Sequence, residues 1–210
     1  MSSLFIVFEG IEGSGKSTQA RLLTEYLTSC GIPCILTREP GGTSTGEEIR
    51  EILLHGCDIP AETELLLMCA ARASHVREVI RPALEAGSVV VSDRYELSTF
   101  AYQGAGRGLD ADDVRRVNRF ATGGLEPDLT IVVDVPWEVG AARRRDLDED
   151  RIEGAGDEFH RRVSEAYRLL SQGVDAVARV NGVGSPEQVH ERVVALLRRR
   201  FPETFASEKG

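Results

Sequence analysis

Residues Gly10–Ser17 read Gly-Ile-Glu-Gly-Ser-Gly-Lys-Ser, the spacing G-x-x-x-x-G-K-[ST] that can bind phosphate groups. The glycines let backbone N–H groups turn toward phosphate oxygens, Lys16 supplies a positive charge, and the Ser17 hydroxyl can ligate Mg²⁺. The apolar run Leu4–Phe8 precedes this segment and the helical stretch Lys16–Ser29 follows it. A phosphate loop between a strand and a helix also gains the positive end of the helix dipole, so the sequence predicts a nucleotide site. The predicted ATP-binding residues are Gly10, Ile11, Glu12, Gly13, Ser14, Gly15, Lys16, Ser17 and Thr18.

The elements that must position this loop alternate along the chain. Short apolar runs without polar alternation indicate strands that are covered on both faces. Longer stretches of helical period lie between them, and this alternation is typical of an α/β fold. We therefore expect a three-layer doubly wound parallel sheet of about five strands, with a ligand crevice at the carboxyl ends of the strands. The predicted strands are Leu4–Phe8, Ile35–Thr37, Val89–Ser92, Leu129–Val135 and Val177–Val180. The predicted helices are Lys16–Ser29, Gly46–Leu54, Glu62–Ala86, Ala111–Ala121, Pro136–Arg145, Glu158–Gln172 and Pro186–Arg199.

The length of the chain and its charge limit what it can be. A chain of 210 residues is long enough for one well-packed domain, and we expect residues 1–210 to form it. The formal net charge of −9 argues against general nucleic-acid binding, which depends on clustered Lys and Arg. No apolar stretch approaches the roughly 20 residues of a membrane span, and no signal peptide precedes the first strand. We expect a soluble cytoplasmic protein that binds neither nucleic acid nor membrane.

One segment departs from the alternation of apolar runs and helical stretches. Residues 146–157 are charged and contain Gly154 and Gly156 between two predicted helices. Composition alone favours an exposed loop, and the functional interpretation is a mobile lid over the nucleotide, at about residues 143–157.

A phosphate loop serves switches, motors and kinases, so other residues must decide among them. The guanine-reading motif Asn-Lys-x-Asp is absent, and a small-molecule kinase is favoured. Such an enzyme holds two anionic ligands, which requires arginines at the strand ends. Arg38 and Arg94 stand at such positions. Asp93 and Asp134 each end an apolar strand and compete for the role of second metal-orienting residue beside Ser17, and Asp93 is favoured because Arg94 follows it.

The chain resembles the bacterial thymidylate kinases. Taken together, Thr-Arg-Glu-Pro-Gly-Gly-Thr and the stretch from Asp-Arg-Tyr to Ala-Tyr-Gln-Gly are close to diagnostic. The matching segments cover the chain from residue 4 to about residue 200 in the expected order, and they are Phe8–Thr18, Thr37–Thr43, Gly46–Arg50, Ala70–Arg72, Asp93–Tyr95, Ser98–Gly104, Gly106–Gly108, Pro127–Thr130 and Asp150–Glu153.

This resemblance implies a sheet of the P-loop nucleoside monophosphate kinase type and transfer of the γ-phosphoryl group of ATP to dTMP, giving dTDP and ADP. It also implies Mg²⁺ as cofactor and a homodimer. By resemblance, Glu12 holds the 3′-hydroxyl of the acceptor, and Arg50 and Arg94 hold its phosphate. Arg72 reaches the thymine ring, where Gln103 and Ser98 read the base edge by hydrogen bonding. The implied dTMP-binding residues are Glu12, Glu39, Pro40, Arg50, Met68, Arg72, Arg94, Ser98, Tyr102 and Gln103. The implied catalytic residues are Lys16, Arg94, Arg151 and Arg143, and the metal residues are Ser17 and Asp93.

Two positions depart from the family pattern. Met68 stands where a phenylalanine usually stacks on thymine, so a polarizable thioether takes the place of the ring. Gly13 stands where some members carry a basic residue in the phosphate loop, which implies that the catalytic arginine comes from the lid. Arg151 is the first choice for that arginine and Arg143 the second. The adenine is expected near Asn181–Gly184.

Several alternatives stay open on the sequence. The acceptor could be another nucleoside monophosphate or a deoxynucleoside, and a nucleotide-dependent binding switch without turnover is the alternative outside enzymes. Glu12 could merely neutralise Lys16. Apolar residues in 65–80, namely Leu65–Met68 with Val76, Val79 and Ile80, could form a dimer interface or face the core.

Overall fold

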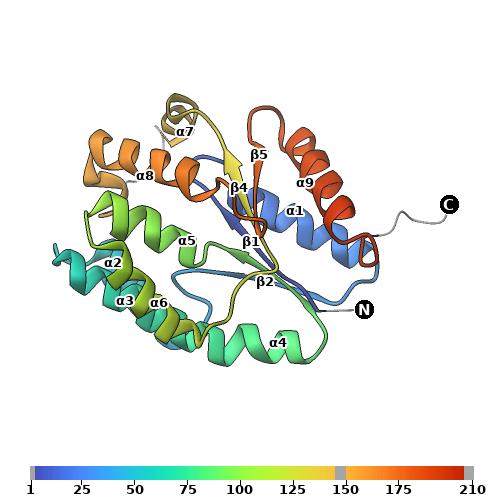
Figure 1. Ribbon diagram of the computed structural model, residues 1–210, viewed down its shortest axis with the longest axis horizontal. Helices are drawn as coiled ribbons and strands as arrows, with labels where there is room; N and C mark the ends of the chain where they lie inside the picture. Colours follow the sequence, from blue (N-terminus) through green and yellow to red (C-terminus); the bar gives the residue numbers. More distant parts are fainter. Residues whose placement is uncertain (1–2, 145–149, 206–210) are drawn as a thin grey trace.

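The computed structural model describes residues 3–144 and 150–205, and a parallel five-stranded sheet lies at its centre. The strand order is β2-β3-β1-β4-β5, so β1 is central, with β2 and β3 on one side of it and β4 and β5 on the other (Figure 1). This arrangement confirms the predicted doubly wound fold. The strands are β1 (Phe5–Glu9), β2 (Cys34–Arg38), β3 (Val89–Asp93), β4 (Leu129–Asp134) and β5 (Val177–Asn181).

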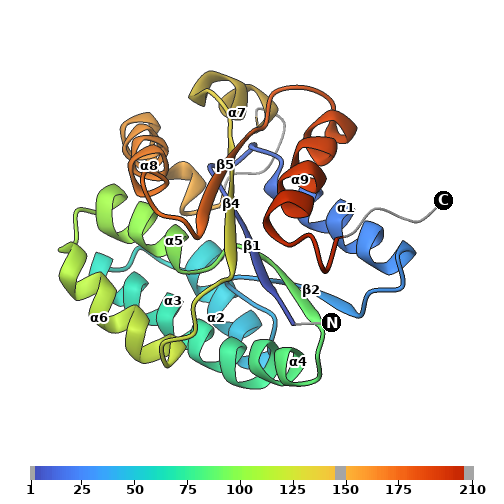
Figure 2. The same ribbon diagram turned by 45° about the vertical axis from the view of Figure 1, so that its right-hand side comes forward.

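Helices cover both faces of the sheet. Two of them, α1 and α9, pack against each other on one face, and α4, α5 and α8 lie on the other side, as both ribbon views show (Figures 1 and 2). The helices are α1 (Lys16–Ser29), α2 (Ser44–His55), α3 (Ala61–His75), α4 (Arg81–Glu85), α5 (Glu96–Thr99), α6 (Ala111–Thr122), α7 (Trp137–Arg144), α8 (Asp157–Leu170) and α9 (Pro186–Arg200).

The apolar run of β1 is buried on both faces of the sheet. Ile6 and Phe8 pack into a cluster with Leu23 of α1, whereas Phe5 and Val7 pack on the opposite face with Ile80. A strand that is covered on both sides has no solvent face, which explains why β1 lacks polar alternation.

Two helical regions differ from the prediction. The predicted helix Glu62–Ala86 is divided by a π-helical segment, η1 (Val76–Ile80), which ends just before Pro82. Proline has no N–H to donate, and a π segment accommodates a local break in the α-helical hydrogen-bond pattern. The sequence prediction also missed α5 and the π-helical segment η2 (Phe100–Gly106) that continues it, because their Gly and Thr content masks the helical period.

The predicted lid at about 143–157 is only partly within the described residues, since 145–149 lie outside them. After that gap, a short 3₁₀ turn, η3 (Glu153–Ala155), leads into α8. Within the described part of the chain, no helix is long and apolar enough to cross a membrane.

Candidate active site

The phosphate loop connects β1 to α1, and its glycines adopt conformations that other residues rarely adopt. Gly10, Gly13 and Gly15 have φ angles of 140°, 76° and 93°. A Cβ atom added to Gly13 would lie 2.3 Å from the carbonyl oxygen of Gly140 in α7. The packing of α7 therefore leaves no room for a side chain at position 13, which gives a physical reason why a basic residue is missing there.

Cavities open on the two sides of this loop. The first contains Lys16 and Ser17 together with most of the residues that the resemblance assigns to dTMP. Gly10 and Ile11 are buried and line neither cavity. The first cavity is lined by Glu12, Lys16, Ser17, Arg38, Glu39, Pro40, Arg50, Leu54, Met68, Asp93, Arg94, Ser98, Tyr102, Gln103, Asp150, Ile152, Glu153 and His160. The second is lined by Gly13, Ser14, Gly15, Thr18, Gln19, Arg143, Gly182, Gly184, Pro186 and Val189.

Glu12 lies between two cations at the edge of the first cavity. Its carboxylate is 3.1 Å from Lys16 Nζ and 2.6 Å from Arg94 Nη2. The charge of Lys16 and then that of Arg94 hold the pKa of Glu12 well below its ordinary value, so the carboxylate is ionised. The contact with Lys16 is the one that the neutralising interpretation expects, and the contact with Arg94 places Glu12 beside the expected acceptor phosphate.

Arg94 follows β3 with a φ of 76°, which is uncommon for a residue with a side chain. Its guanidinium donates to Ser98 Oγ at 3.0 Å and lies over the Tyr102 ring, 5.0 Å from the centroid. Burial would lower the pKa of Arg94, but the neighbouring oxygens of Tyr102, Tyr167 and Glu12 raise it well above its ordinary value. A strained backbone that is held by so many contacts is typical of a functional position.

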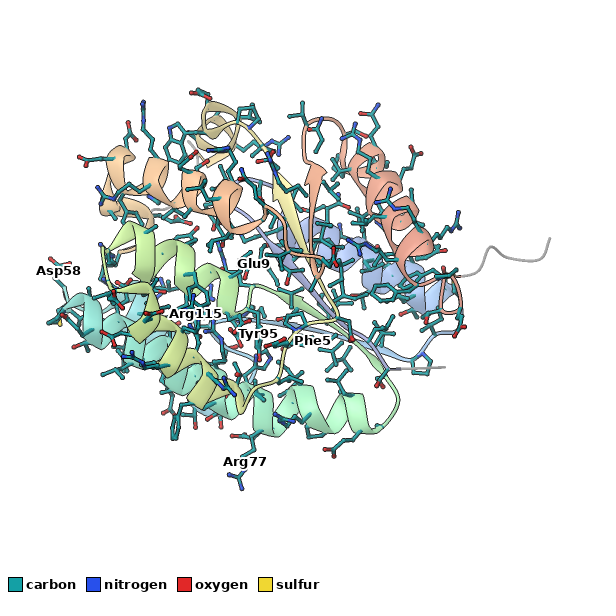
Figure 3. The ribbon with its side chains drawn as sticks, in the orientation of Figure 1. Phe5, Glu9, Asp58, Arg77, Tyr95 and Arg115 are labelled. Carbon is teal, nitrogen blue, oxygen red and sulfur yellow. The ribbon has the colours of Figure 1, made fainter. Side chains whose placement is uncertain are left out.

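Behind Arg94 lies Glu9, a buried carboxylate that the sequence analysis missed. It accepts hydrogen bonds from the backbone N–H groups of Tyr95 and Ser98 and from the Tyr167 hydroxyl, all within 2.9 Å. Burial raises the pKa of Glu9. Figure 3 shows Glu9 and Tyr95 in the interior, whereas the side chain of Arg77 projects outward. Glu9 thus stabilises the turn that carries Arg94.

A site for Mg²⁺ needs carboxylate or hydroxyl oxygens that are not already bonded. Asp93 Oδ1 is buried without a hydrogen-bond partner among the described residues, and it lines the same cavity as Ser17 and Lys16. Asp134, the competing candidate, forms an ion pair with Arg179. Within the described ranges, no three His, Cys, Asp or Glu side chains gather into a metal site. Mg²⁺ usually takes only one or two protein carboxylates and completes its shell with phosphates and water, so Ser17 and Asp93 fit it.

Glu39, Pro40 and Arg50 form the wall of the cavity next to β2. Arg50 Nη1 donates to the carbonyl oxygen of Pro40 at 3.0 Å. Burial lowers the pKa of Arg50, although its side chain still borders the cavity. This wall therefore presents the charge of Arg50 beside the carboxyl group of Glu39, and Arg38 at the end of β2 lines the same cavity.

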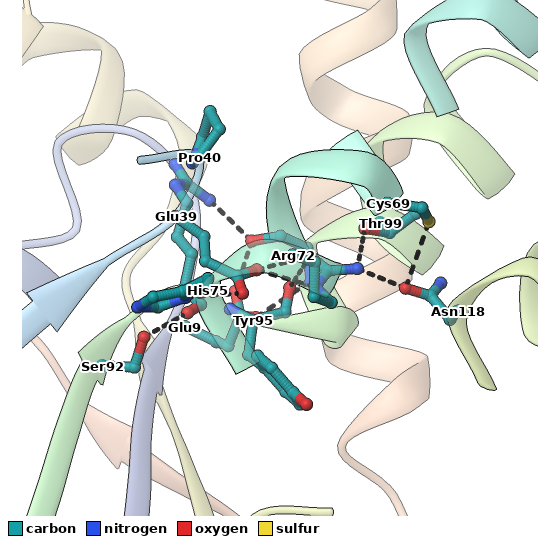
Figure 4. Close-up of polar contacts among 12 residues, drawn as sticks. Glu9, Glu39, Pro40, Cys69, Arg72, His75, Ser92, Tyr95, Thr99 and Asn118 are labelled. Atoms are coloured by element: carbon teal, nitrogen blue, oxygen red, sulfur yellow. Dashed lines mark hydrogen bonds and ion pairs between the residues drawn. The ribbon is translucent and has the colours of Figure 1, made fainter. Parts of the chain in front are cut away.

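Arg72 was expected at the thymine ring, but the structure does not bring it to the cavity surface. Its side chain is 1% exposed, and Nε donates to Glu39 at 2.7 Å. Its other nitrogens donate to Thr99, Asn118 and the carbonyl oxygen of Tyr95 (Figure 4). A buried guanidinium needs partners for all its donors, and these neighbours supply them. Arg72 stands behind Glu39, and its contact with thymine stays a prediction.

The far end of the first cavity is formed by side chains from helices. Met68 of α3 and Gln103 of η2 both line it and are almost fully buried. Gln103 Nε2 donates to Glu64 at 2.8 Å. The Ser98 hydroxyl donates to Glu9 at 2.6 Å and is therefore already engaged.

The structure separates the two lid arginines. Arg143 Nη1 donates to the carbonyl oxygens of Gly13 and Ser14 at 3.1 and 3.3 Å. Arg151 instead lies 2.7 Å from Glu64 and donates from Nε to the carbonyl oxygen of Leu53. The second choice thus contacts the phosphate loop, whereas the first choice is held against Glu64 and lines neither cavity.

The sequence analysis missed a group of residues that border or support the first cavity. They carry no special spacing of their own, and only the matching segments Phe8–Thr18, Gly106–Gly108 and Asp150–Glu153 marked some of them. They are Glu9, Leu54, Glu64, Arg107, Asp150, Ile152, Glu153, His160 and Tyr167.

Comparisons with known proteins agree with this geometry. The sequence profile of the thymidylate kinase family matches residues 8–193. A thymidylate kinase of a Synechococcus strain is 48% identical over 207 residues, which cover 98% of this chain and all of the relative. The thymidylate kinase of Thermomicrobium roseum is 54% identical over 177 residues, which cover 81% of this chain and 82% of the relative. The crystal structure of thymidylate kinase from Ehrlichia chaffeensis superimposes with a TM-score of 0.77 at 32% identity, covering 94% of this chain and 99% of that one.

Proposed function

The chain belongs to the thymidylate kinase family, and we propose that it transfers the γ-phosphoryl group of ATP to dTMP at the carboxyl ends of β1 and β3. The observation that carries this proposal is the pair of cavities on either side of one phosphate loop. The dTMP would occupy the first cavity and the ATP would enter through the second. In this arrangement the two phosphate groups meet at Lys16.

The chemistry requires positioning and charge stabilisation rather than a strong base, because the acceptor phosphate is already ionised. Lys16 is 3% exposed and is the first residue of α1, directly after the glycines of the loop, where it would contact the transferred group. Arg94 would hold the acceptor phosphate, helped by Arg50 across the cavity. Glu12 lies 2.6 Å from Arg94, at a place where it would accept a hydrogen bond from the deoxyribose 3′-hydroxyl.

The family implies Mg²⁺, and Ser17 and Asp93 are the residues that would hold it. When bound, the ion neutralises charge on the ATP phosphates.

For the lid arginine we propose Arg143 in preference to Arg151. Its support is the pair of hydrogen bonds to Gly13 and Ser14, which keep the guanidinium beside the expected phosphates. An arginine at that place stabilises the negative charge of the transition state.

The experiment that tests the proposed function measures ADP release with ATP and a panel of acceptors, namely dTMP, dUMP, dCMP, dGMP, AMP and thymidine. We expect dTMP to give the highest kcat/KM. Preference for another acceptor would assign the cavity to that compound. Tight ATP binding with no acceptor-stimulated ADP release would instead favour the binding switch.

The family likeness also leads us to propose a homodimer in the cytoplasm. Of the candidate interface residues Leu65–Met68, Val76, Val79 and Ile80, four are buried in the chain's own core, namely Leu65, Met68, Val76 and Ile80, whereas Leu66 is exposed. Leu66 is 58% exposed on α3 and Phe120 is 90% exposed on α6, and these two helices pack together. Sedimentation equilibrium tests the homodimer, since Phe120→Asp should shift the protein toward monomer.

A further inference from the structure

Glu64 is a buried carboxylate that no step described so far uses. It is 0% exposed, yet it receives contacts from three side chains on two segments of the chain. Its Oε1 accepts from Gln103 Nε2 at 2.8 Å and from Arg107 Nε at 3.2 Å. Its Oε2 lies 3.0 Å from Arg107 Nη2 and 2.7 Å from Arg151 Nη2. Burial would raise the pKa of Glu64, but the hydrogen bonds from Arg107 and Gln103 outweigh it and lower the pKa.

An ionised carboxylate can only accept hydrogen bonds, and this property determines how the Gln103 amide is turned. The atom of that amide that faces Glu64 must be the donor Nε2. The other atom, Oε1, is buried without a hydrogen-bond partner among the described residues, and Gln103 lines the first cavity. A buried acceptor without a partner costs free energy unless a ligand supplies a donor.

We propose that Glu64 is a positioning residue that turns Gln103 so that Oε1 faces the base as a hydrogen-bond acceptor. This inference rests on the proposed function, because it places the base of the acceptor nucleotide in the first cavity. The group that an acceptor recognises is an imide N–H, which thymine and uracil carry at N3. Cytosine has a lone pair at N3, which would repel Oε1.

The arginines explain why the orientation is stable. Arg107 lies over the Phe159 ring, 4.6 Å from its centroid, and Arg151 donates from Nε to the carbonyl oxygen of Leu53. Both arginines bind the carboxylate of Glu64, and Gln103 Nε2 donates a hydrogen bond to the lone pair that remains. Ser98 cannot replace Gln103 as the free acceptor, because its hydroxyl is already bonded to Glu9 and Arg94.

The test compares kcat/KM for dTMP and dCMP in Glu64→Gln. Its new amide would turn its only oxygen toward the arginines and its NH₂ toward Gln103, which must then turn Oε1 away from the cavity. We expect the dTMP-to-dCMP ratio to fall roughly tenfold or more, with the loss in KM for dTMP rather than in kcat. Glu64→Asp keeps the carboxylate and should keep the ratio within about threefold. Glu165→Gln removes an exposed charge paired with Arg168 and is the matched control.

The outcomes separate the hypotheses. An unchanged ratio in folded Glu64→Gln, or an equal fall in Glu64→Asp, overturns the positioning role. An equal fall in the Gln103→Leu background also overturns it, because the effect would then not pass through Gln103. Neutron diffraction of the wild-type protein with dTMP needs no variant: deuterons on the Gln103 atom that faces the base would contradict the proposal. A wild type that phosphorylates dCMP but not dTMP overturns both this inference and the proposed function, whereas the results above overturn the inference alone.

Discussion

The two ends of the first cavity are built on different principles. At the phosphate end, Glu12, Lys16 and Arg94 come from loops that follow neighbouring strands β1 and β3, and their charges lie next to one another. At the base end, Met68 and Gln103 come from helical segments, and the charged Glu64 stands behind them. Under the proposed function, the phosphate end would present charged side chains to the ligand, whereas the base end would present a neutral amide with the charged groups behind it.

A cavity with two such ends can stabilise a transition state at one end and discriminate between ligands at the other. Charges near the transferred group stabilise the transition state, so changes there should act on kcat. A neutral amide in a buried wall discriminates by hydrogen-bond direction, so changes there should act on KM and on the choice of base. A substitution at one end should therefore leave the property that belongs to the other end largely unchanged.

The largest effect is expected for Arg94→Ala at the phosphate end. The variant removes the cation that contacts Glu12, Ser98 and Tyr102, and kcat/KM for dTMP should fall by on the order of 10³ or more. Steady-state kinetics measure this loss, with Arg168→Ala as a surface control. A loss below about tenfold in the folded variant would remove Arg94 from the acceptor site.

Smaller effects are expected from substitution of the two lid arginines, and the two variants should differ in whether kcat or KM changes. Arg143→Ala should lower kcat by roughly 10²–10³. Arg151→Ala should leave kcat within about threefold and raise KM for dTMP, because Arg151 contacts Glu64 at the base end. Rapid-quench measurement of the phosphoryl-transfer step distinguishes them. If Arg151→Ala lowered kcat and Arg143→Ala did not, the catalytic arginine would be Arg151. The two ends of the cavity would then not have separate roles.

The phosphate end could largely be predicted from the sequence because its residues are close together in the chain or end neighbouring strands. The glycine spacing defines the loop that contains Lys16, and parallel strands bring their carboxyl ends to one edge of the sheet. The same rule brought Asp93 and Arg94 to the cavity. The order of apolar runs predicted the sheet for a similar reason, since each buried strand needs cover on both faces.

The base end could not be predicted in this way. Glu64 is separated from Gln103 by 39 residues in the sequence. The segment that carries Gln103 is a π helix, which the spacing of apolar residues did not predict. Arg72 shows the same limit, because a resemblance can assign a contact with thymine but cannot reveal that Glu39, Thr99 and Asn118 surround the guanidinium. Side-chain partners at such distances follow from packing, which sequence motifs do not record.

The smallest effect is expected for Glu12. Its contacts are compatible both with binding of the 3′-hydroxyl of dTMP and with neutralisation of the neighbouring cations. If Glu12 binds the 3′-hydroxyl of dTMP, the wild type should lose roughly tenfold in kcat/KM with 3′-deoxy-dTMP, the value of a hydrogen bond to a charged group. Glu12→Gln should lose less between the same two substrates, because a neutral amide forms the weaker bond. If Glu12 only neutralises Lys16 and Arg94, both proteins should lose equally. Glu47→Gln, which removes an exposed carboxylate paired with Arg38, controls for the change in net charge. Equal losses would mean that the phosphate end uses Glu12 to arrange its own cations, and recognition of the sugar would then have to come from residues nearer the base.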